Sequence, residues 1–368
     1  MKKYKKIFAL LVALVMVLSF TACGGGDTGG GGDVAGGDEG KVGISMPTMD
    51  LQRWNQDGNN MKSAFEAAGF TVDLQYAQND VPMQINQIEN MIAAGVDVLV
   101  IAAIDGGSLT EVLAEAQRND IAVIAYDRLI MGTDAVSYYV TFDNWKVGTL
   151  QGTFLEDALD LPNADGHFYI EFFTGDPGDN NIHFFFGGAM EVLRPYLDSG
   201  TLVCLSGQTE TAQVATIAWD PANAQARMEN LIATHNYSPT GQRLDAVMCS
   251  NDSTAQGVTT ALQGAGFTAD NFPLVTGQDC DIVSVRNMIA GYQAMSVFKD
   301  TRTLAAQTVT MVTAILNGNT VPINNTSDYD NGTGIIPTFL CDPVFADINN
   351  FEELLIDSGY YTRSELGL

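Results

Sequence analysis

Residues 98–128 read VLVIAAIDGGSLTEVLAEAQRNDIAVIAYDR, and this stretch decides the fold. Its two ends, residues 98–102 and 122–126, are apolar runs of the length and composition of buried strands. Between them, residues 109–119 place apolar side chains at helical spacing. A strand, a helix and a second strand in this order are typical of a parallel sheet with crossover helices.

The same alternation continues in both directions from this unit. Further strands are predicted at residues 42–46, 71–76, 138–142, 168–173, 201–206, 246–249, 274–276, 294–298 and 335–340. Further helices are predicted at residues 51–68, 82–94, 145–159, 181–197, 221–234, 253–264 and 302–316. About 330 residues follow Gly40, more than one hydrophobic core usually organises. The sequence therefore predicts an α/β fold with two doubly wound parallel-sheet lobes.

The N-terminus has a different composition. Four lysines among the first six residues precede an apolar run over residues 7–18, which is shorter than the ~20 residues that span a bilayer. This pattern predicts an export signal over residues 1–22. Residues 24–40 are mostly Gly with a few acids, a composition typical of a flexible tether.

Residues 18–23, LSFTAC, resemble the bacterial lipobox, with Phe20 where that motif usually has Leu. The resemblance implies that Cys23 is lipidated and anchors the exported protein to the outer face of the cytoplasmic membrane. The alternative is an ordinary secretory signal in which Cys23 has no role.

The charge of the chain excludes some classes of partner. The formal net charge is −27, and loss of the four signal lysines leaves 13 basic and 44 acidic side chains. These acids are spread along the chain, so nucleic-acid binding and adhesion to anionic lipid are disfavoured. We expect contact with the membrane through the lipid anchor alone.

The remaining cysteines, Cys204, Cys249, Cys280 and Cys341, lie singly at apolar strand edges and form no metal-binding spacing. Free buried thiols are expected, and a Cys249–Cys280 disulfide is the alternative. No metal or cofactor site is predicted.

Polar side chains follow many of the predicted strands, where parallel sheets carry their ligand-binding loops. A monosaccharide presents hydroxyl groups that donate and accept hydrogen bonds and apolar faces that an aromatic ring can cover. The polar set suits such a ligand. It offers acceptors (Asp127, Asp279, Asn181, Asn251), donors (Arg53, Arg128, Lys299) and aromatic plates (Trp54, Trp219).

Several short segments together form a specific pattern: Arg53-Trp54, residues 84–90 (QINQIEN), 124–128 (IAYDR), 141–144 (TFDN), 178–181 (GDNN), 219–221 (WDP), Asn251-Asp252, 277–279 (GQD) and 297–300 (VFKD). In these segments the chain resembles the type I periplasmic binding proteins of sugar ABC importers, in particular the xylose-binding and multiple-monosaccharide-binding receptors, over residues 41–368. The resemblance implies ligand contacts from Arg53, Asp127, Arg128, Asn181, Trp219, Asn251, Asp279 and Lys299. Stacking by Trp54 is our own inference.

The resemblance also implies how the chain is organised. Two lobes joined by a three-stranded hinge are expected at residues 41–142 plus 280–337 and at residues 143–279 plus 338–368. A monomer that delivers its sugar to an ABC permease is the implied function. Asn251 favours the xylose type, whereas residues 219–221 and 184–186 favour the multiple-sugar type, so xylose, glucose and galactose stay open.

Other interpretations compete at several of these positions. Asp179 and Asp252 are expected to cap helices rather than contact a ligand. Trp145 and residues 184–186 are expected in the core. Asp127-Arg128 could be a surface ion pair and Trp219 a helix-entry residue.

Two other functions use the same fold. A sugar sensor that signals to a membrane kinase or chemoreceptor could use the same closure. An enzyme would need a carboxylate pair or an activated nucleophile, and we predict no catalytic residue.

Overall fold

The computed structural model describes residues 40–368. The predicted signal peptide (residues 1–22), Cys23 and the tether up to Glu39 lie outside these residues. None of the helices in the described range is long and apolar enough to cross a membrane.

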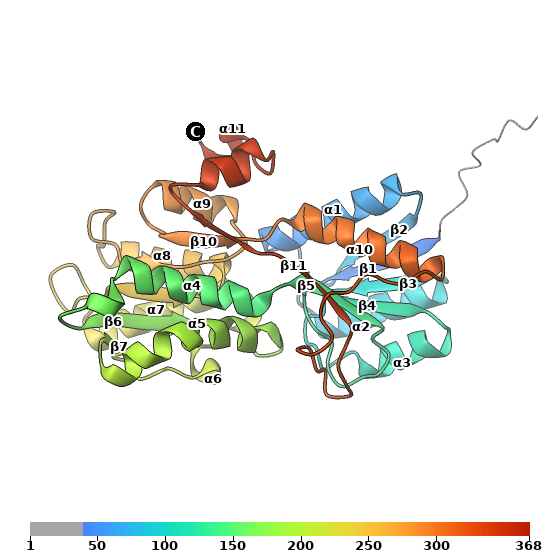
Figure 1. Ribbon diagram of the computed structural model, residues 1–368, viewed down its shortest axis with the longest axis horizontal. Coiled ribbons are helices and arrows are strands. Elements are labelled where there is room, and N and C mark those ends of the chain that lie inside the picture. The colour runs from blue at the N-terminus through green and yellow to red at the C-terminus, as the bar shows by residue number, and fades with distance from the viewer. Residues whose placement is uncertain (1–39) are drawn as a thin grey trace, which may run out of the picture. The chain divides into compact units, whose positions relative to one another are not determined.

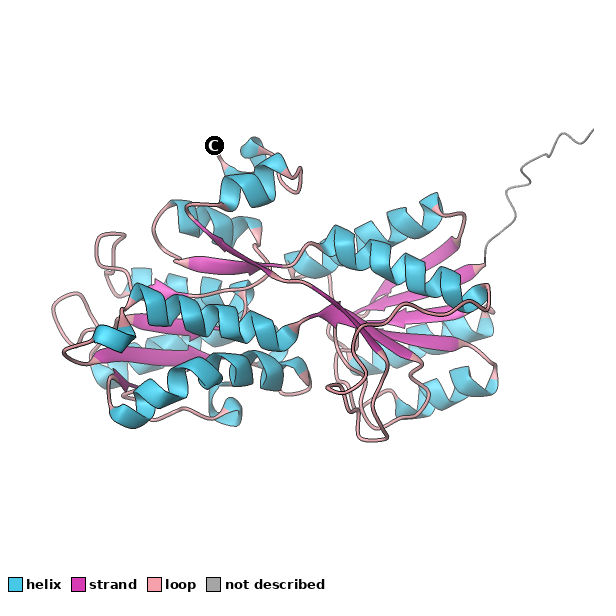
Figure 2. Cartoon of the chain, viewed as in Figure 1, coloured by secondary structure: helices cyan, strands magenta, loops and turns pink. Residues whose placement is uncertain are grey.

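The first sheet has six parallel strands in the order β11-β5-β4-β3-β1-β2 (Figure 1). Its strands are β1 (Lys41–Met46), β2 (Thr71–Tyr76), β3 (Val98–Ile101), β4 (Ala122–Tyr126), β5 (Tyr138–Phe142) and β11 (Thr338–Cys341). Helices lie over both of its faces (Figure 2). They are α1 (Gln52–Ala67), α2 (Val81–Ala93), α3 (Thr110–Arg118) and α10 (Thr301–Leu316). Val and Ile side chains of the central strands are buried on both sides, as a two-sided parallel sheet requires.

The second sheet has four parallel strands in the order β7-β6-β8-β9. Its strands are β6 (Phe168–Phe173), β7 (Leu202–Val203), β8 (Ala246–Cys249) and β9 (Leu274–Val275). The segment after β9 continues alongside β10 (Met295–Phe298) through a parallel bridge between Gln278 and Val297. β10 in turn pairs antiparallel with β12 (Val344–Asp347). Both sheets therefore repeat one doubly wound strand order.

The helices of the second lobe pack closely. They are α4 (Asn144–Ala158), α5 (Asn181–Ser199), α6 (Thr211–Val214), α7 (Pro221–His235), α8 (Asp252–Gly264), α9 (Ile282–Ile289) and α11 (Arg363–Leu366), with short helices η1 (Leu161–Asn163), η2 (Ile217–Trp219) and η3 (Glu352–Asp357). Glycines bring α4 and α5 together, because a Cβ at Gly148 or Gly188 would overlap the backbone of the other helix.

The lobe boundaries differ from the expected ones in two segments. Residues 280–298 were expected in the first lobe, but α9 packs against α8 and β10 packs against α4. β11 was expected in the second lobe, but it pairs with β5. The chain thus passes between the lobes after β5, after β10 and after β11. The middle crossing lies about 20 residues later than expected, because residues 278–281 stay beside β10 in the second lobe, where the Asp279 N–H donates to the Val297 carbonyl at 2.8 Å.

The cysteines of the described range, Cys204, Cys249, Cys280 and Cys341, are free thiols. All but Cys204 are buried, and Cys249 and Cys280 are not joined. Their roles are therefore those of small apolar side chains.

Candidate ligand-binding site

Residues from both lobes line one narrow cavity of about 30 Å³. The lining residues are Leu51, Arg53, Trp54, Asp127, Arg128, Asp179, Phe185, Trp219, Asn251, Ser253, Gln278, Asp279, Asp281 and Lys299.

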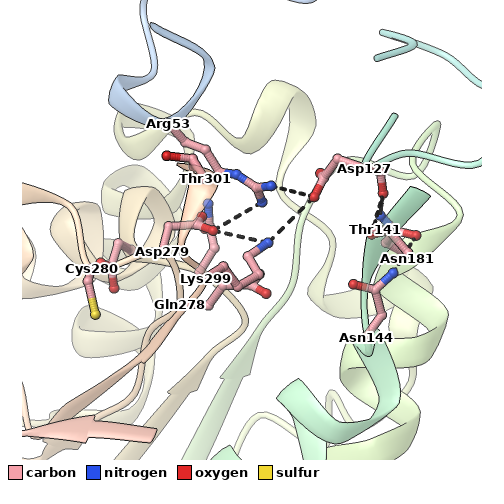
Figure 3. Close-up of polar contacts among 12 residues, drawn as sticks. Arg53, Asp127, Thr141, Asn144, Asn181, Gln278, Asp279, Cys280, Lys299 and Thr301 are labelled. Carbon is pink, nitrogen blue, oxygen red and sulfur yellow. Dashed lines mark hydrogen bonds and ion pairs between the residues drawn. The ribbon is translucent and has the colours of Figure 1, made fainter. Parts of the chain in front are cut away.

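Arg53, in the first turn of α1, points toward Asp127 and Asp279 (Figure 3). Its Nη2 donates to Asp127 Oδ1 at 2.5 Å and its Nη1 donates to Asp279 Oδ1 at 3.2 Å. Its Nε donates to Asp57 Oδ2 at 2.9 Å, one turn along the same helix. The planar guanidinium thus joins a carboxylate of each lobe, which a lysine could not do with the same geometry.

Lys299 reaches the same two carboxylates from the end of β10. Its Nζ lies 3.0 Å from Asp279 Oδ1 and 3.8 Å from Asp127 Oδ1. Lys299 is 2% exposed, so these ion pairs are shielded from solvent. Each of these contacts is made through Oδ1 of Asp127 or Asp279.

The local charges set the protonation of this cluster. Burial would raise the pKa of Asp127, but Arg53 and Lys299 outweigh it and hold that pKa below its usual value. Burial opposes the charge of Arg53, yet its carboxylate neighbours raise its pKa well above the usual range. Asp57 is buried behind Arg53 and bonded to Tyr126 Oη, and burial raises its pKa to about 6. Asp127 therefore stays ionised and can accept hydrogen bonds from hydroxyl groups.

The backbone of Asp127 is fixed in a left-handed conformation, with φ of 59°. Its carbonyl oxygen accepts hydrogen bonds from Tyr139 Oη at 2.6 Å, Thr141 Oγ1 at 3.1 Å and Asn181 Nδ2 at 2.6 Å. Asp tolerates this conformation better than most residues do. Three donors on one carbonyl hold the carboxylate at the end of β4 in place.

Trp54 and Arg128 form the part of the wall next to Asp127. The Arg128 guanidinium lies 4.9 Å from the centre of the Trp54 ring, and its Nε lies 3.0 Å from Asp179 Oδ2. Its Nη1 donates to the Ala103 carbonyl at 3.0 Å. The Trp54 ring thus has a cation against it, which competes with a stacked sugar for the aromatic face.

Trp219 and Asn251 come from the second lobe. Trp219 is 4% exposed, and its Nε1 has no hydrogen-bond partner within residues 40–368. Its carbonyl accepts from Ser253 Oγ, which in turn accepts from Asn251 Nδ2, both at 2.7 Å. Asn251 Oδ1 also caps α8 by accepting from the Thr254 N–H at 3.0 Å. The amide of Asn251 is therefore engaged at both ends.

The structure brings eight of the nine predicted ligand residues to the cavity; Asn181 does not line it. Asn181 is 1% exposed, and its amide holds Asp127 while accepting from Asn144 and Tyr139. Asn181 lies behind the residues that line the cavity, and its hydrogen bonds are made to protein groups. It therefore supports the cavity wall.

The two residues expected to cap helices behave differently. Asp179 accepts from the Asn181 N–H at 3.0 Å, yet it also lines the cavity and pairs with Arg128. Asp252 does not cap α8; its carboxylate accepts from the Asp281 N–H at 2.8 Å and from Ser296 Oγ at 2.9 Å. It ties the turn after β9 to β10.

Aromatic residues of α4 and α5 also depart from expectation. Trp145 was expected in the core but is 44% exposed, with its Nε1 bonded to Glu191. Phe185 lines the cavity and meets the Trp219 ring edge to face at 6.2 Å. Helical spacing alone does not predict that Phe185, rather than Phe184 or Phe186, lines the cavity.

The remaining lining residues were not predicted: Leu51, Ser253, Gln278 and Asp281. Gln278 and Asp281 lie within two positions of the predicted Asp279 at a strand end. This closeness in sequence is the signal that could have identified them. No group of His, Cys, Asp and Glu able to hold a metal ion occurs in the described part of the chain.

Comparison with known proteins gives this arrangement a family. The sequence model of the periplasmic binding protein domain matches residues 42–320. The chain belongs to the periplasmic binding protein family. The multiple sugar-binding periplasmic protein SbpA of Azospirillum brasilense is 49% identical over 330 residues, 89% of this chain and 91% of that protein. The D-xylose-binding periplasmic protein of Escherichia coli K12 is 35% identical over 328 residues, 89% of this chain and 93% of that protein.

A solved structure resembles that of this chain. It is an ABC transporter solute binding protein from Clostridium phytofermentans with bound β-D-glucose, 58% identical, with a TM-score of 0.86. The match covers 89% of this chain and 99% of that one. The doubly wound lobes described above are therefore the fold of this family.

Proposed function

We propose that this protein captures a monosaccharide of the xylose, glucose or galactose type in the cavity and delivers it to an ABC importer. The observation that carries the proposal is the cluster of Arg53, Asp127, Asp279 and Lys299, in which each cation lies within 4 Å of a carboxylate from each lobe. Hydroxyl groups pair with such charged groups more strongly than with neutral ones. The relatives named above for sugar binding support the same ligand class.

Binding on this proposal is an exchange of contacts. The narrow space between the side chains requires the sugar to separate groups that now touch, such as Arg53 and Asp279 at 3.2 Å. Its hydroxyls then replace the ion-pair contacts across the two lobes. A sugar that touches both lobes favours one lobe arrangement through its differential affinity, and the permease recognises that arrangement.

A thermal-shift screen against aldopentoses and aldohexoses tests the proposal. A ligand at 100 times its Kd stabilises the native state by about 2.7 kcal/mol, so a bound sugar raises the melting temperature. Asp127→Ala is expected to weaken the best sugar by roughly 100-fold or more, because it removes one partner of a buried charge pair. Calorimetry measures this loss, and circular dichroism checks the fold. Unchanged affinity in Asp127→Ala contradicts the site, and no shift with any monosaccharide contradicts the function.

We further propose that a lipid on Cys23 holds the protein at the outer face of the cytoplasmic membrane. The apolar run of residues 7–18 followed by small residues and Cys23 supports this proposal. Cys23→Ser is expected to move the protein from the membrane fraction to the soluble fraction of the cell envelope or medium. Equal membrane retention of both forms contradicts the anchor.

A further inference from the structure

Asp281 lies at the start of α9 and lines the cavity. It is not among the ligand contacts predicted from the sequence. It is 7% exposed, and its Oδ1 has no hydrogen-bond partner within residues 40–368. Its Oδ2 has one long contact, 3.4 Å from Gln256 Nε2. Buried polar atoms in native proteins are paired in the large majority of cases, so an unpaired acceptor in a cavity wall needs an explanation.

Helix capping does not explain it. Asp281 occupies the N-cap position of α9, but its side chain makes no capping hydrogen bond. The carboxylate is therefore not used in N-capping, which is the role that an Asp at the start of a helix most often has.

The backbone around Asp281 is held on both sides. The Asp281 N–H donates to Asp252 Oδ2 at 2.8 Å, and the Ile282 N–H donates to Gln52 Oε1 at 3.0 Å. The preceding carbonyl, of Cys280, accepts from Tyr361 Oη at 2.9 Å. A carboxylate on such a fixed segment cannot move far to reach solvent, so its partner has to come into the cavity.

The charges around Asp281 favour a neutral hydrogen-bond donor. Asp279 and Asp252 lie close enough to repel it, while Arg53 and Lys299 attract it more weakly because both already pair with Asp279. Burial, with repulsion from Asp279, raises the pKa of Asp281 to about 7. A hydroxyl group satisfies the acceptor without adding charge.

We propose that Asp281 is a further ligand-contacting residue, whose Oδ1 accepts a hydrogen bond from one hydroxyl group of the bound monosaccharide. The proposal rests on the proposed function and adds a specificity determinant to it. A site built to accept from a given hydroxyl discriminates against the analogue that lacks it, because the buried acceptor is then left unpaired.

Calorimetric titrations of a ligand series test this pairing. The sugar with the largest thermal shift and each of its monodeoxy analogues are titrated into the wild-type protein, Asp281→Ala and Asp281→Asn. We expect one deoxy analogue to bind the wild type at least tenfold more weakly than the parent sugar and to lose nothing further on Asp281→Ala. Asp281→Asn keeps an acceptor oxygen, so the penalty for removing that hydroxyl group is intermediate in this variant. Asp270→Asn, the same change at an exposed carboxylate, is the matched control and binds as the wild type does.

The outcomes separate the two proposals. If every deoxy penalty is the same in Asp281→Ala as in the wild type, Asp281 contacts no hydroxyl, although sugar binding stands. If Asp281→Ala does not fold, Asp281→Asn is compared with the wild type instead. Deoxy penalties that are the same in Asp281→Asn as in the wild type then contradict the proposal. If the wild type binds no monosaccharide, the proposed function fails and this inference fails with it.

Discussion

Trp219 rests directly on the backbone of Gly175. A Cβ at residue 175 would overlap the indole ring, so the absence of a side chain there sets how deep the ring lies. Trp219 itself has φ of 55°, and its neighbour Ala218 has φ of 58°. The Ala218 N–H donates to Asp176 Oδ2 at 2.5 Å, which fixes this unusual turn. The ring therefore cannot move any closer to residue 175, and Trp219 lines the cavity.

Gly175→Ala is expected to push the indole into the cavity and weaken sugar binding. Overpacking of this kind costs about 1–3 kcal/mol, or roughly 5- to 150-fold in affinity. Alanine is compatible with the backbone at residue 175, since its φ lies outside the left-handed region. Calorimetry on Gly175→Ala measures the effect. Gly166→Ala, at an exposed glycine with open space around it, is the matched control.

A double substitution tests whether the Trp219 ring causes the weaker sugar binding of Gly175→Ala. In a Trp219→Ala background, Gly175→Ala is expected to cost nothing more, because the clashing ring is gone. Equal losses in both backgrounds would mean that residue 175 acts through something other than Trp219.

At the residue scale, the sequence predicted which side chains gather but not what each one does. Arg53 and Asp279 are 226 positions apart, and their order along the chain does not show that they touch. Asn181 and Asn251 have the amides that a sugar site requires, yet their hydrogen bonds hold Asp127 and cap α8. For Asn181 the partner is 54 positions away in the sequence, whereas Asn251 is engaged by its near neighbours Ser253 and Thr254.

At the scale of elements, buried parallel strands were predictable because their Val and Ile runs are continuous. The helix α9 was missed, since its eight residues are too short to show a helical period among Val and Ile. β11 begins at Thr338 rather than at residue 335, directly after Pro337, which has no N–H for pairing with a neighbouring strand.

The partner of a strand is a further property that local patterns do not determine. β10 reads as one more apolar run, and nothing in its residues shows that it pairs with β12. The expected position of the middle crossing was wrong for this reason. The polar segment at residues 278–281 has the composition of a linker, but its hydrogen bonds to Val297 and Ser296 keep it in the second lobe.

At the scale of the whole molecule, buried acids link stability to pH. Burial raises the pKa of Asp57 to about 6 and that of Asp281 to about 7, whereas both titrate near ~3.9 in an unfolded chain. Between these values the native state binds more protons than the unfolded state, so the free energy of unfolding falls as the pH rises. The protons that Asp57 and Asp281 bind in the native state are fully bound at low pH. They are lost, with the stability they contribute, as the pH rises through 6–7.

We therefore expect the melting temperature of the ligand-free protein to rise when the pH is lowered from 8 to 5. The titratable groups that act on Asp281 are Asp279, Asp252, Arg53 and Lys299. Mutual repulsion of surface acids changes in the same direction, but 0.5 M salt screens it while leaving buried groups largely unscreened. Melting curves in that salt should show a smaller rise for Asp281→Asn than for the wild type, because the amide does not titrate. An equal rise in both, with Asp270→Asn as the surface control, would place the linked proton elsewhere than Asp281.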